Sequence, residues 1–265
     1  MPPPLLMGIL NVTPDSFSDG GRFRGLEAAL DHARLMKEEG ADVIDVGGES
    51  TRPGAEAVAV EEELARVLPV VERLAIEGLG PVSIDTRKAR VMREAAAMGA
   101  AMLNDVSALT HDPESLSTAA RLGLPVVLMH SLGEPATMQR NPQYEDVIAE
   151  VTAALRARRD AAEAAGIPRE RIWLDPGIGF GKTRDHNLAL LRNLGALKAL
   201  GCKVLLGASR KRFIAALDRD VPPEARLGGS VAVSIWGARA GADMLRVHDV
   251  GATRQALAVW GAIAG

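Results

Sequence analysis

The chain repeats one pattern of hydrophobic and polar positions from end to end. Each repeat has a short apolar run, a polar residue at or just after its end, a turn and then a helical stretch. The apolar runs lie at 5–10, 43–44, 82–84, 102–103, 126–129, 172–174, 204–206 and 244–245. Parallel strands buried on both faces have such runs, and parallel pairing requires crossover helices between the strands. The pattern predicts an α/β fold, the (β/α)8 or TIM barrel.

Polar side chains follow these predicted strands at their carboxyl ends. They are Asn11, Asp45, Asp85, Asn104, His130 and Asp175, then Ser209 and Lys211 after the seventh run, and Arg246 and His248 after the eighth. In a (β/α)8 barrel every strand ends on the same face, and active sites lie there. These side chains are therefore predicted to converge on one pocket.

Five stretches have apolar residues at helical spacing, which predicts outer crossover helices. They are 26–39, 61–77, 89–98, 145–165 and 186–200. Glycine follows or closes several helical stretches, at Gly40, Gly78, Gly99, Gly123, Gly166 and Gly201. Glycine adopts the left-handed conformation that ends many helices, so these positions are predicted helix ends.

The length of 265 residues suits one barrel, and no linker or charge block divides the chain, which predicts a single domain over 1–265. The 31 basic and 34 acidic residues leave a net charge of −3, which argues against nucleic-acid or anionic-membrane binding. The charge-free start is too short and too rich in proline for a membrane span, and it lacks the basic segment of a signal peptide. The single Cys202 forbids an internal disulfide and favours the cytoplasm.

Two predicted strand-to-helix loops, 11–23 and 47–57, are long and rich in glycine. Long loops in a compact domain are uncommon unless they are functional, so we interpret both as loops that cover a substrate; tolerated surface insertions are the alternative. The segment 175–183 has the sequence DPGIGFGKT, but a Walker phosphate loop requires glycine where the chain has Pro176. A G-x-G-x-x-G motif starting at Gly177 requires glycine at Lys182, which excludes a dinucleotide fingerprint too.

Three carboxylates and one amide end predicted strands: Asp45, Asp85, Asp175 and Asn104. A lone ionised group costs several kcal/mol to bury without partners. One such residue can cap the next helix, but four together are hard to explain as caps. Carboxylates and amides in this arrangement suit a flat heterocycle with N–H donors and ring acceptors, because bidentate pairing fixes its orientation.

Around these groups lie side chains that favour anions: Arg52, Lys211, Arg246 and His248. Arginine pairs bidentately with phosphate oxygens and lysine supplies a point charge, so this set indicates a phosphate-bearing substrate. The neighbouring Arg210 and Arg212 are predicted to face solvent or the following helix.

The sequence indicates a magnesium site rather than a zinc site. The five histidines and one cysteine lack zinc spacing. Mg²⁺ commonly shares one or two protein oxygens with substrate phosphates, and Asn11 is the candidate ligand. His130 has no catalytic partner in the pattern, and we expect it to support other side chains.

A series of motifs covers the chain from end to end. They are GILNVTPDSFSDGG (8–21), DVGGESTRPGA (45–55), SIDT (83–86), NDV (104–106), LMH (128–130), GEPATMQ (133–139), DPGIGFGK (175–182), GASRK (207–211), RLGGSVA (226–232) and RVHDV (246–250). Together they closely resemble the dihydropteroate synthase family. The resemblance implies a TIM-barrel transferase of folate synthesis that joins hydroxymethyl-dihydropterin diphosphate to p-aminobenzoate and releases diphosphate.

The resemblance also implies residue roles. Hydrogen bonds to the pterin edge are implied for Asp85, Asn104 and Asp175, with Lys211 reaching the ring and Arg246 stacking on it. His248 and Asn11 should hold the diphosphate with Mg²⁺, while Asp45 should organise the loops and this metal-diphosphate assembly. The implied aminobenzoate pocket consists of Phe17, Thr51, Arg52, Pro53, Phe180 and Ser209. The implied catalytic set is Asn11, Asp45, Arg52, Lys211, Arg246 and His248.

The implied reaction is dissociative, because the electron-rich pterin can stabilise positive charge on its exocyclic methylene as the C–O bond breaks. We expect no covalent enzyme intermediate. Two alternatives stay open: a pterin-dependent methyltransferase, which would not need a grip on diphosphate, and a catalytically silent pterin-binding paralogue. The family is usually dimeric, and the apolar stretches 256–264 and 231–236 are candidate contacts between copies in a homodimer.

Overall fold

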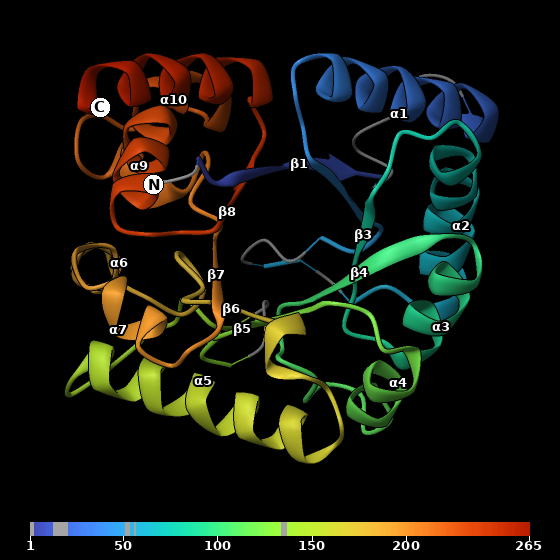
Figure 1. Cartoon of the computed structure of the whole chain (residues 1–265), viewed down its shortest axis with the longest axis horizontal. Helices are drawn as coiled ribbons and strands as arrows, with labels where there is room; N and C mark the ends of the chain where they lie inside the picture. Colours follow the sequence, from blue (N-terminus) through green and yellow to red (C-terminus); the bar gives the residue numbers. More distant parts are fainter. Residues whose placement is uncertain (1–2, 13–20, 51–53, 56, 134–136) are drawn as a thin grey trace.

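The computed structural model describes residues 3–12, 21–50, 54–55, 57–133 and 137–265. Eight parallel strands form a closed barrel in chain order, and helices surround it (Figure 1). The strands are β1 (Leu5–Asn11), β2 (Val43–Gly47), β3 (Val82–Asp85), β4 (Ala100–Asp105), β5 (Val126–Met129), β6 (Ile172–Asp175), β7 (Lys203–Leu206) and β8 (Met244–Val247). The predicted TIM barrel is confirmed.

The helices form the outer layer of the barrel in Figure 1. They are α1 (Gly21–Glu38), α2 (Val60–Ile76), α3 (Ala89–Ala97), α4 (Ser115–Leu122), α5 (Val147–Ala164), α6 (Arg184–Arg192), α7 (Gly195–Lys198), α8 (Arg212–Ala215), α9 (Leu227–Arg239) and α10 (Val250–Ala264). Short 3-10 turns, η2 (Arg169–Arg171) and η3 (Pro223–Arg226), precede β6 and α9. In the described part of the chain, none of the helices combines the length and the apolar character that crossing a membrane requires.

The prediction of one helix over 186–200 is wrong, because the chain breaks between α6 and α7. Asn193 ends α6, and its Nδ2 donates to the Ala189 carbonyl oxygen at 2.9 Å. Asparagine competes in this way for backbone groups, and Gly195, two positions later, is a poor helix former. The first long loop is also shorter than predicted, because α1 already begins at Gly21.

The six glycines that were predicted to end helices all have positive φ angles, between 63° and 107°, as predicted. Gly123 is typical of them: it closes α4 with φ 63°, and its N–H donates to the Ala119 carbonyl oxygen at 3.1 Å. Other residues pay a steric cost in this conformation, so glycine sets where the chain turns toward the next strand.

The barrel interior holds an apolar layer that is separate from the core under the helices. This layer consists of Met7, Val43, Met102, Val127, Trp173, Leu205 and Met244. Because side chains alternate between the two faces of a strand, residues two positions further along also face the interior. Four of those positions are polar: Asp45, Asn104, Asp175 and Arg246. The apolar layer is therefore the floor on which polar strand ends are presented.

Candidate active site

The guanidinium of Arg246 joins the polar ends of the strands. Its Nε donates to Asp45 Oδ2 at 2.6 Å and its Nη2 donates to Asp85 Oδ2 at 2.8 Å. Asn104 Nδ2 donates to the same oxygen of Asp45 at 3.0 Å. The predicted convergence is thus found for β2, β3, β4 and β8, which are distant in the sequence.

This cluster contains buried charge that is only partly compensated. Asp45 is fully buried, and its Oδ1 has no hydrogen-bond partner among the described residues. Burial raises the pKa of Asp85 to about 7, although Arg246 lowers it, and the Asp45 carboxylate raises it further. Two carboxylates around one guanidinium leave an excess of acceptors, which suits a ligand that presents N–H donors.

Two glycines keep the backbone open beside these groups. A Cβ at Gly47 would lie 3.5 Å from Asp85 Cβ and 3.8 Å from Asn11 Oδ1. A Cβ at Gly207 would lie 3.5 Å from Asp175 Oδ2 and 3.8 Å from Arg246 Cβ. Glycine inside a barrel often marks a place where a ligand approaches the backbone. Asn11 and Asp175 therefore border the same region as the Arg246 cluster.

Asp175 is held by the loop that follows β6. Its Oδ1 accepts a hydrogen bond from the Gly177 N–H at 2.7 Å. Gly177 has φ 66°, and a Cβ there would meet the His130 carbonyl oxygen at 1.9 Å, so only glycine fits. Burial raises the pKa of Asp175 to about 6, against the lowering effects of the Gly177 hydrogen bond and of Lys211, Arg246 and Lys182.

Lys211 and Phe180 meet at the edge of the site. Lys211 Nζ lies 4.0 Å from the centroid of the Phe180 ring, within the range of a cation–π contact. A Cβ at Gly179 would lie 3.2 Å from Lys211 Cδ, so the aliphatic part of Lys211 passes close to Gly179. The pterin contact predicted at Lys211 and the aminobenzoate contact predicted at Phe180 are therefore adjacent.

His248 is paired with Ser209. The Ser209 hydroxyl accepts from the His248 backbone N–H at 3.2 Å and lies 3.0 Å from His248 Nδ1. Burial lowers the pKa of His248 to about 3, and Arg246 and Arg210 lower it too. The imidazole is neutral, and when the Ser209 hydroxyl donates to Nδ1 the remaining N–H is on Nε2. His248 thus offers a neutral donor to an anion, and it is not one of the cations.

The two arginines beside Lys211 differ. Arg212 is exposed at the start of α8, as predicted. The prediction is wrong for Arg210, whose Nε donates to Asp249 Oδ2 at 3.0 Å and whose Nη2 donates to Asp249 Oδ1 at 2.5 Å. Asp249 precedes α10, so this ion pair joins the loops after β7 and β8. The sequence reasoning missed it because the partners are 39 positions apart.

Some predicted site residues lie outside the described residues: Phe17, Thr51, Arg52 and Pro53. Their aminobenzoate and diphosphate contacts stay predictions. The described residues place Asn11, Asp45, Asp85, Asn104, Asp175, Phe180, Ser209, Lys211, Arg246 and His248 at the strand ends or in the loops directly after them. Their individual roles also stay predictions. Within the described part, the contacts of Asp45 run to Asn104 and Arg246, at the predicted pterin end.

The sequence reasoning also missed a buried ionic network beside β3. Lys88 Nζ donates to Glu63 and lies 3.3 Å from Glu49 Oε2, while Arg87 Nη2 lies 3.4 Å from Glu49 Oε1. All four side chains are buried. The basic pair directly after the SIDT motif was the available signal, because charges next to a strand end need partners when buried.

The oxygen donors on the neighbouring strands β1 and β2 suit magnesium better than a metal held by protein alone. Among the described residues no three histidine, cysteine, aspartate or glutamate side chains group to hold a metal ion. The Oδ1 atoms of Asn11 and Asp45 are oxygen donors, and no described residue bonds the second. Mg²⁺ accepts one or two protein oxygens when substrate phosphates complete its shell, so the residues fit it.

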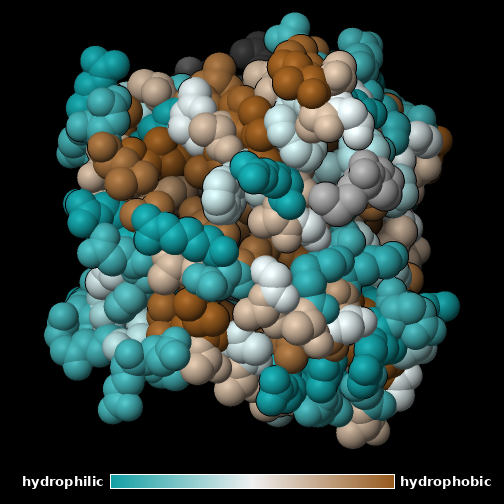
Figure 2. Space-filling model, turned by 60° about the vertical axis from the view of Figure 1, so that its left-hand side comes forward, coloured by the Kyte–Doolittle hydropathy of each residue, from teal (hydrophilic) through white to brown (hydrophobic). Residues whose placement is uncertain are grey.

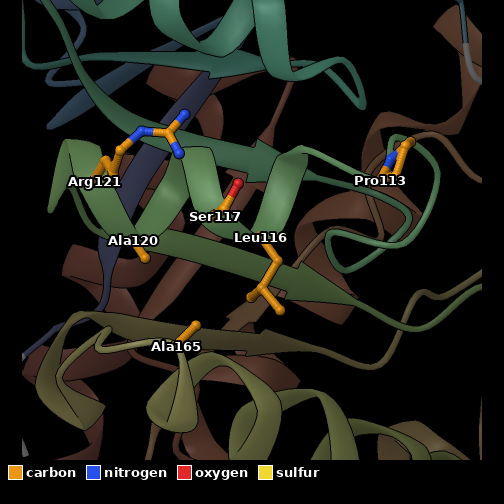
Figure 3. Close-up of a pocket in the computed structure, with 6 residues that line it drawn as sticks. All are labelled: Pro113, Leu116, Ser117, Ala120, Arg121 and Ala165. Atoms are coloured by element: carbon orange, nitrogen blue, oxygen red, sulfur yellow. The ribbon is translucent and has the colours of Figure 1, made fainter.

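A surface depression of about 560 Å³ lies away from the strand ends, beside α4 and the end of α5. Its lining in Figure 3 is Pro113, Leu116, Ser117, Ala120, Arg121 and Ala165. This lining offers one cation and one hydroxyl, in contrast to the clustered carboxylates, amide and cations inside the barrel. The site therefore lies at the carboxyl ends of the strands.

Comparison with known proteins gives a consistent result. The family described as "Pterin binding enzyme" matches residues 7–248. A dihydropteroate synthase of Haemophilus influenzae is 49% identical, over 98% of this chain and 94% of its own length. A Xanthomonas albilineans dihydropteroate synthase solved with 4-aminobenzoic acid has a TM-score of 0.93 and 53% identity, covering 99% of this chain and 94% of that one. A Yersinia pestis dihydropteroate synthase in a sulfonamide drug complex has a TM-score of 0.93 and 46% identity, with the same coverage.

Proposed function

Because the chain belongs to the dihydropteroate synthase family, we propose that it joins 6-hydroxymethyl-7,8-dihydropterin diphosphate to p-aminobenzoate, forming 7,8-dihydropteroate and diphosphate. It is a transferase of folate biosynthesis. The main support for the proposal is the cluster of Asp45, Asp85 and Asn104 around Arg246. Asp175 and Arg246 both lie next to Gly207, so Asp175 borders this cluster. A pterin ring presents N–H donors and ring acceptors along one edge, and these groups complement it.

The pterin is held by side chains that the fold orients before it binds. Asn104 Nδ2 donates to Asp45 Oδ2, which orients the amide and leaves Asn104 Oδ1 to accept from the ligand. Asp85 and Asp175 accept from pterin N–H groups in their ionised forms. The two carboxylates occupy Nε and Nη2 of Arg246, so the flat face of its guanidinium is available to stack on the ring.

The bond that breaks joins the exocyclic methylene of the pterin to the diphosphate oxygen. The electron-rich ring stabilises the positive charge on the methylene, and the departing diphosphate takes up the negative charge. Arg246, Lys211 and the neutral donor of His248 stabilise this charge where it develops, together with Arg52. Asn11 would hold Mg²⁺ together with substrate oxygens, and the bound ion would supply further positive charge at the leaving group.

The amine of p-aminobenzoate then attacks the methylene, and its N–H proton leaves after the C–N bond has formed. An aryl amine requires no strong base, so no covalent enzyme intermediate is needed. Phe180 and Ser209 border its pocket, together with Phe17, Thr51, Arg52 and Pro53. Since sulfonamides resemble p-aminobenzoate in shape, we propose that they compete for this pocket.

The test is an assay of the purified chain with the pterin diphosphate, run with and without p-aminobenzoate and Mg²⁺. We expect diphosphate release and dihydropteroate, detected by mass, only when both are present. Pterin binding without turnover would contradict the proposal and indicate the silent paralogue. Methyl transfer to a corrinoid, measured in parallel, would instead indicate the methyltransferase.

We also propose a homodimer formed through α9 and α10, which pack against each other. This face exposes large apolar side chains, among them Trp236 at 43%, Val259 at 56% and Ile263 at 80%. Figure 2 turns this side of the molecule forward and shows apolar residues gathered in its upper part. A second copy that covers them removes apolar surface from water, which is favourable.

Light scattering should give twice the chain mass for the wild type and a single chain mass for a Val259→Glu, Ile263→Glu variant, because a buried charge opposes association. The matched control is Leu35→Glu, at a leucine of α1 that is 49% exposed, and it should stay dimeric. A wild type that is monomeric at micromolar concentration would contradict the proposal.

We expect the enzyme in the cytoplasm. Cys202 is buried and free, and it is the only cysteine in the chain. A chain without disulfides suits a reducing compartment. Fractionation of the source cells would test this expectation.

A further inference from the structure

Lys182, in the loop after β6, is almost completely buried, with 3% of its surface exposed. Its Nζ lies 3.0 Å from the Phe180 carbonyl oxygen, 3.3 Å from the His130 carbonyl oxygen and 3.0 Å from His130 Nδ1. A lysine ammonium has three N–H donors, and all three find an acceptor here. The side chain thus joins the end of β5 to the loop after β6.

The charge states agree with this geometry. Burial and the charge of Lys182 lower the pKa of His130 to about 3, so its ring is neutral and Nδ1 can accept. Burial also lowers the pKa of Lys182 to about 7, whereas the Asp175 carboxylate raises it. A neutral amine has only two N–H donors, so it satisfies all three contacts only when His130 Nδ1 carries a proton and donates it to the amine. The charged form with Nδ1 as an acceptor satisfies all three contacts.

The rest of this loop is fastened by other contacts. Gly179 N–H donates to Asn187 Oδ1 at 2.8 Å, and Tyr144 donates to the Gly181 carbonyl oxygen at 3.0 Å. The Phe180 carbonyl oxygen lies between these two points and is bonded by Lys182. Lys182 thus fixes the backbone of Phe180 through its carbonyl oxygen. The ring of Phe180 in turn contacts the ammonium of Lys211.

We propose that Lys182 is a positioning residue of the reaction, whose buried ammonium fixes the Phe180 ring against Lys211 where the pterin and aminobenzoate sites meet. This inference rests on the proposed function. In this proposal His130 supplies two of the three groups that Lys182 contacts, its carbonyl oxygen and Nδ1. Lys182 itself touches neither substrate and acts through Phe180 and through its charge.

The charge of Lys182 has an effect of its own on Asp175. The groups around Asp175 are the Gly177 N–H and Lys182 from its own loop, Lys211 from the loop after β7, Arg246 from β8, and the neutral His130 after β5. All the charged ones lower its pKa. Removing Lys182 therefore raises the pKa of Asp175 further, and the carboxylate that accepts from the pterin is lost at a higher pH.

The experiment compares wild type with Lys182→Met, which keeps an unbranched apolar side chain and removes the charged amino group. KM for p-aminobenzoate should rise at least about tenfold, because small displacements at a reacting pair are costly. The acid limb of kcat/KM for the pterin diphosphate should move to higher pH. In a Phe180→Leu background the same substitution should raise KM for p-aminobenzoate far less, since it acts through that ring.

The matched control is Lys203→Met, at an exposed lysine that begins β7 and contacts Trp173 from the other end of the barrel. It should leave both parameters unchanged. A Lys182→Met enzyme with wild-type KM and an unmoved acid limb would overturn the proposal. Absence of turnover in wild type itself would count against the proposed function and not against this role of Lys182.

A second pair of variants tests the same contact if Lys182→Met does not fold. His130→Asn retains an acceptor near the position of Nδ1, whereas His130→Leu removes it. We expect His130→Asn to have a KM for p-aminobenzoate close to that of wild type, and His130→Leu to follow the direction of Lys182→Met. Equal behaviour of the two His130 variants would contradict the proposal.

Discussion

Replacing Arg246 by alanine lowers kcat/KM for the pterin diphosphate by a factor of about a thousand, which corresponds to about 4 kcal/mol. The substitution removes the hydrogen bonds to Asp45 and Asp85 and leaves two buried carboxylates without their cation. Breaking a buried ion pair on one side costs about 3–5 kcal/mol. Under the proposed function it also removes the guanidinium that we expect to stack on the pterin and to face the leaving group. Steady-state kinetics measures the effect.

Two further variants show whether the loss comes from the geometry of the Arg246 guanidinium or from removing any arginine. Arg246→Lys retains the charge but cannot bond two carboxylates with a rigid fork, so we expect most of the loss to persist. Arg192→Ala removes an exposed arginine from the last turn of α6 and should leave kcat/KM unchanged. An Arg246→Ala enzyme that keeps more than about a tenth of wild-type kcat/KM would show that the guanidinium is not central to transition-state binding.

Replacing Asp175 by asparagine abolishes pterin binding and at the same time stabilises the unliganded protein. Asparagine can still accept from the Gly177 N–H, but it presents no negative charge to the pterin N–H groups. The folded protein raises the pKa of Asp175 from 3.8 to about 6. One pKa unit corresponds to about 1.4 kcal/mol, so the ionised carboxylate destabilises the fold by up to about 3 kcal/mol.

The direction in which stability changes with pH follows from how tightly each state binds the Asp175 proton. Between pH 4 and 6 the folded state holds the Asp175 proton more tightly than the unfolded state, so stability falls as pH rises through this range. Above pH 6 the Asp175 carboxylate is mainly ionised in the folded protein, and the loss of folding stability is close to its full value. Urea unfolding at pH 8 should therefore show Asp175→Asn to be more stable than wild type by about 1–3 kcal/mol, with a smaller difference near pH 4.

The control for this experiment is Asp220→Asn, at an exposed aspartate between η3 and α8, which should change stability little at either pH. Equal stability of wild type and Asp175→Asn at pH 8 would mean that the carboxylate is not strained by burial. Calorimetry with a non-reactive pterin then reports the binding loss separately from the gain in stability.

The positions of the site residues were predictable because they depend on local patterns and on one topological rule. Apolar runs mark buried strands, and a parallel barrel brings all strand ends to one face. Asp45, Asp85, Asn104 and Asp175 followed directly from these two facts. The glycines at helix ends were also predictable, since the left-handed conformation they adopt is a property of the residue itself.

Pairings and charge states depend on the tertiary structure. Arg246 bonds Asp45 across 201 positions of sequence, and Lys182 meets His130 across 52. His248 could be read from the sequence as a cation, yet burial and nearby arginines keep it neutral. Lys182, Phe180 and His130 all belong to sequence motifs, but no motif shows that the ammonium meets the His130 ring and the two carbonyl oxygens.

The sequence by itself determined the barrel, the face that carries the chemistry and the family of the reaction, because strand burial and motif spacing are properties of short segments. Only the tertiary structure decided which carboxylates share Arg246, that His248 is neutral and what Lys182 contacts. Hydrogen bonds and pKa values depend on distances of a few ångströms and on exclusion of water, and the closed barrel sets both.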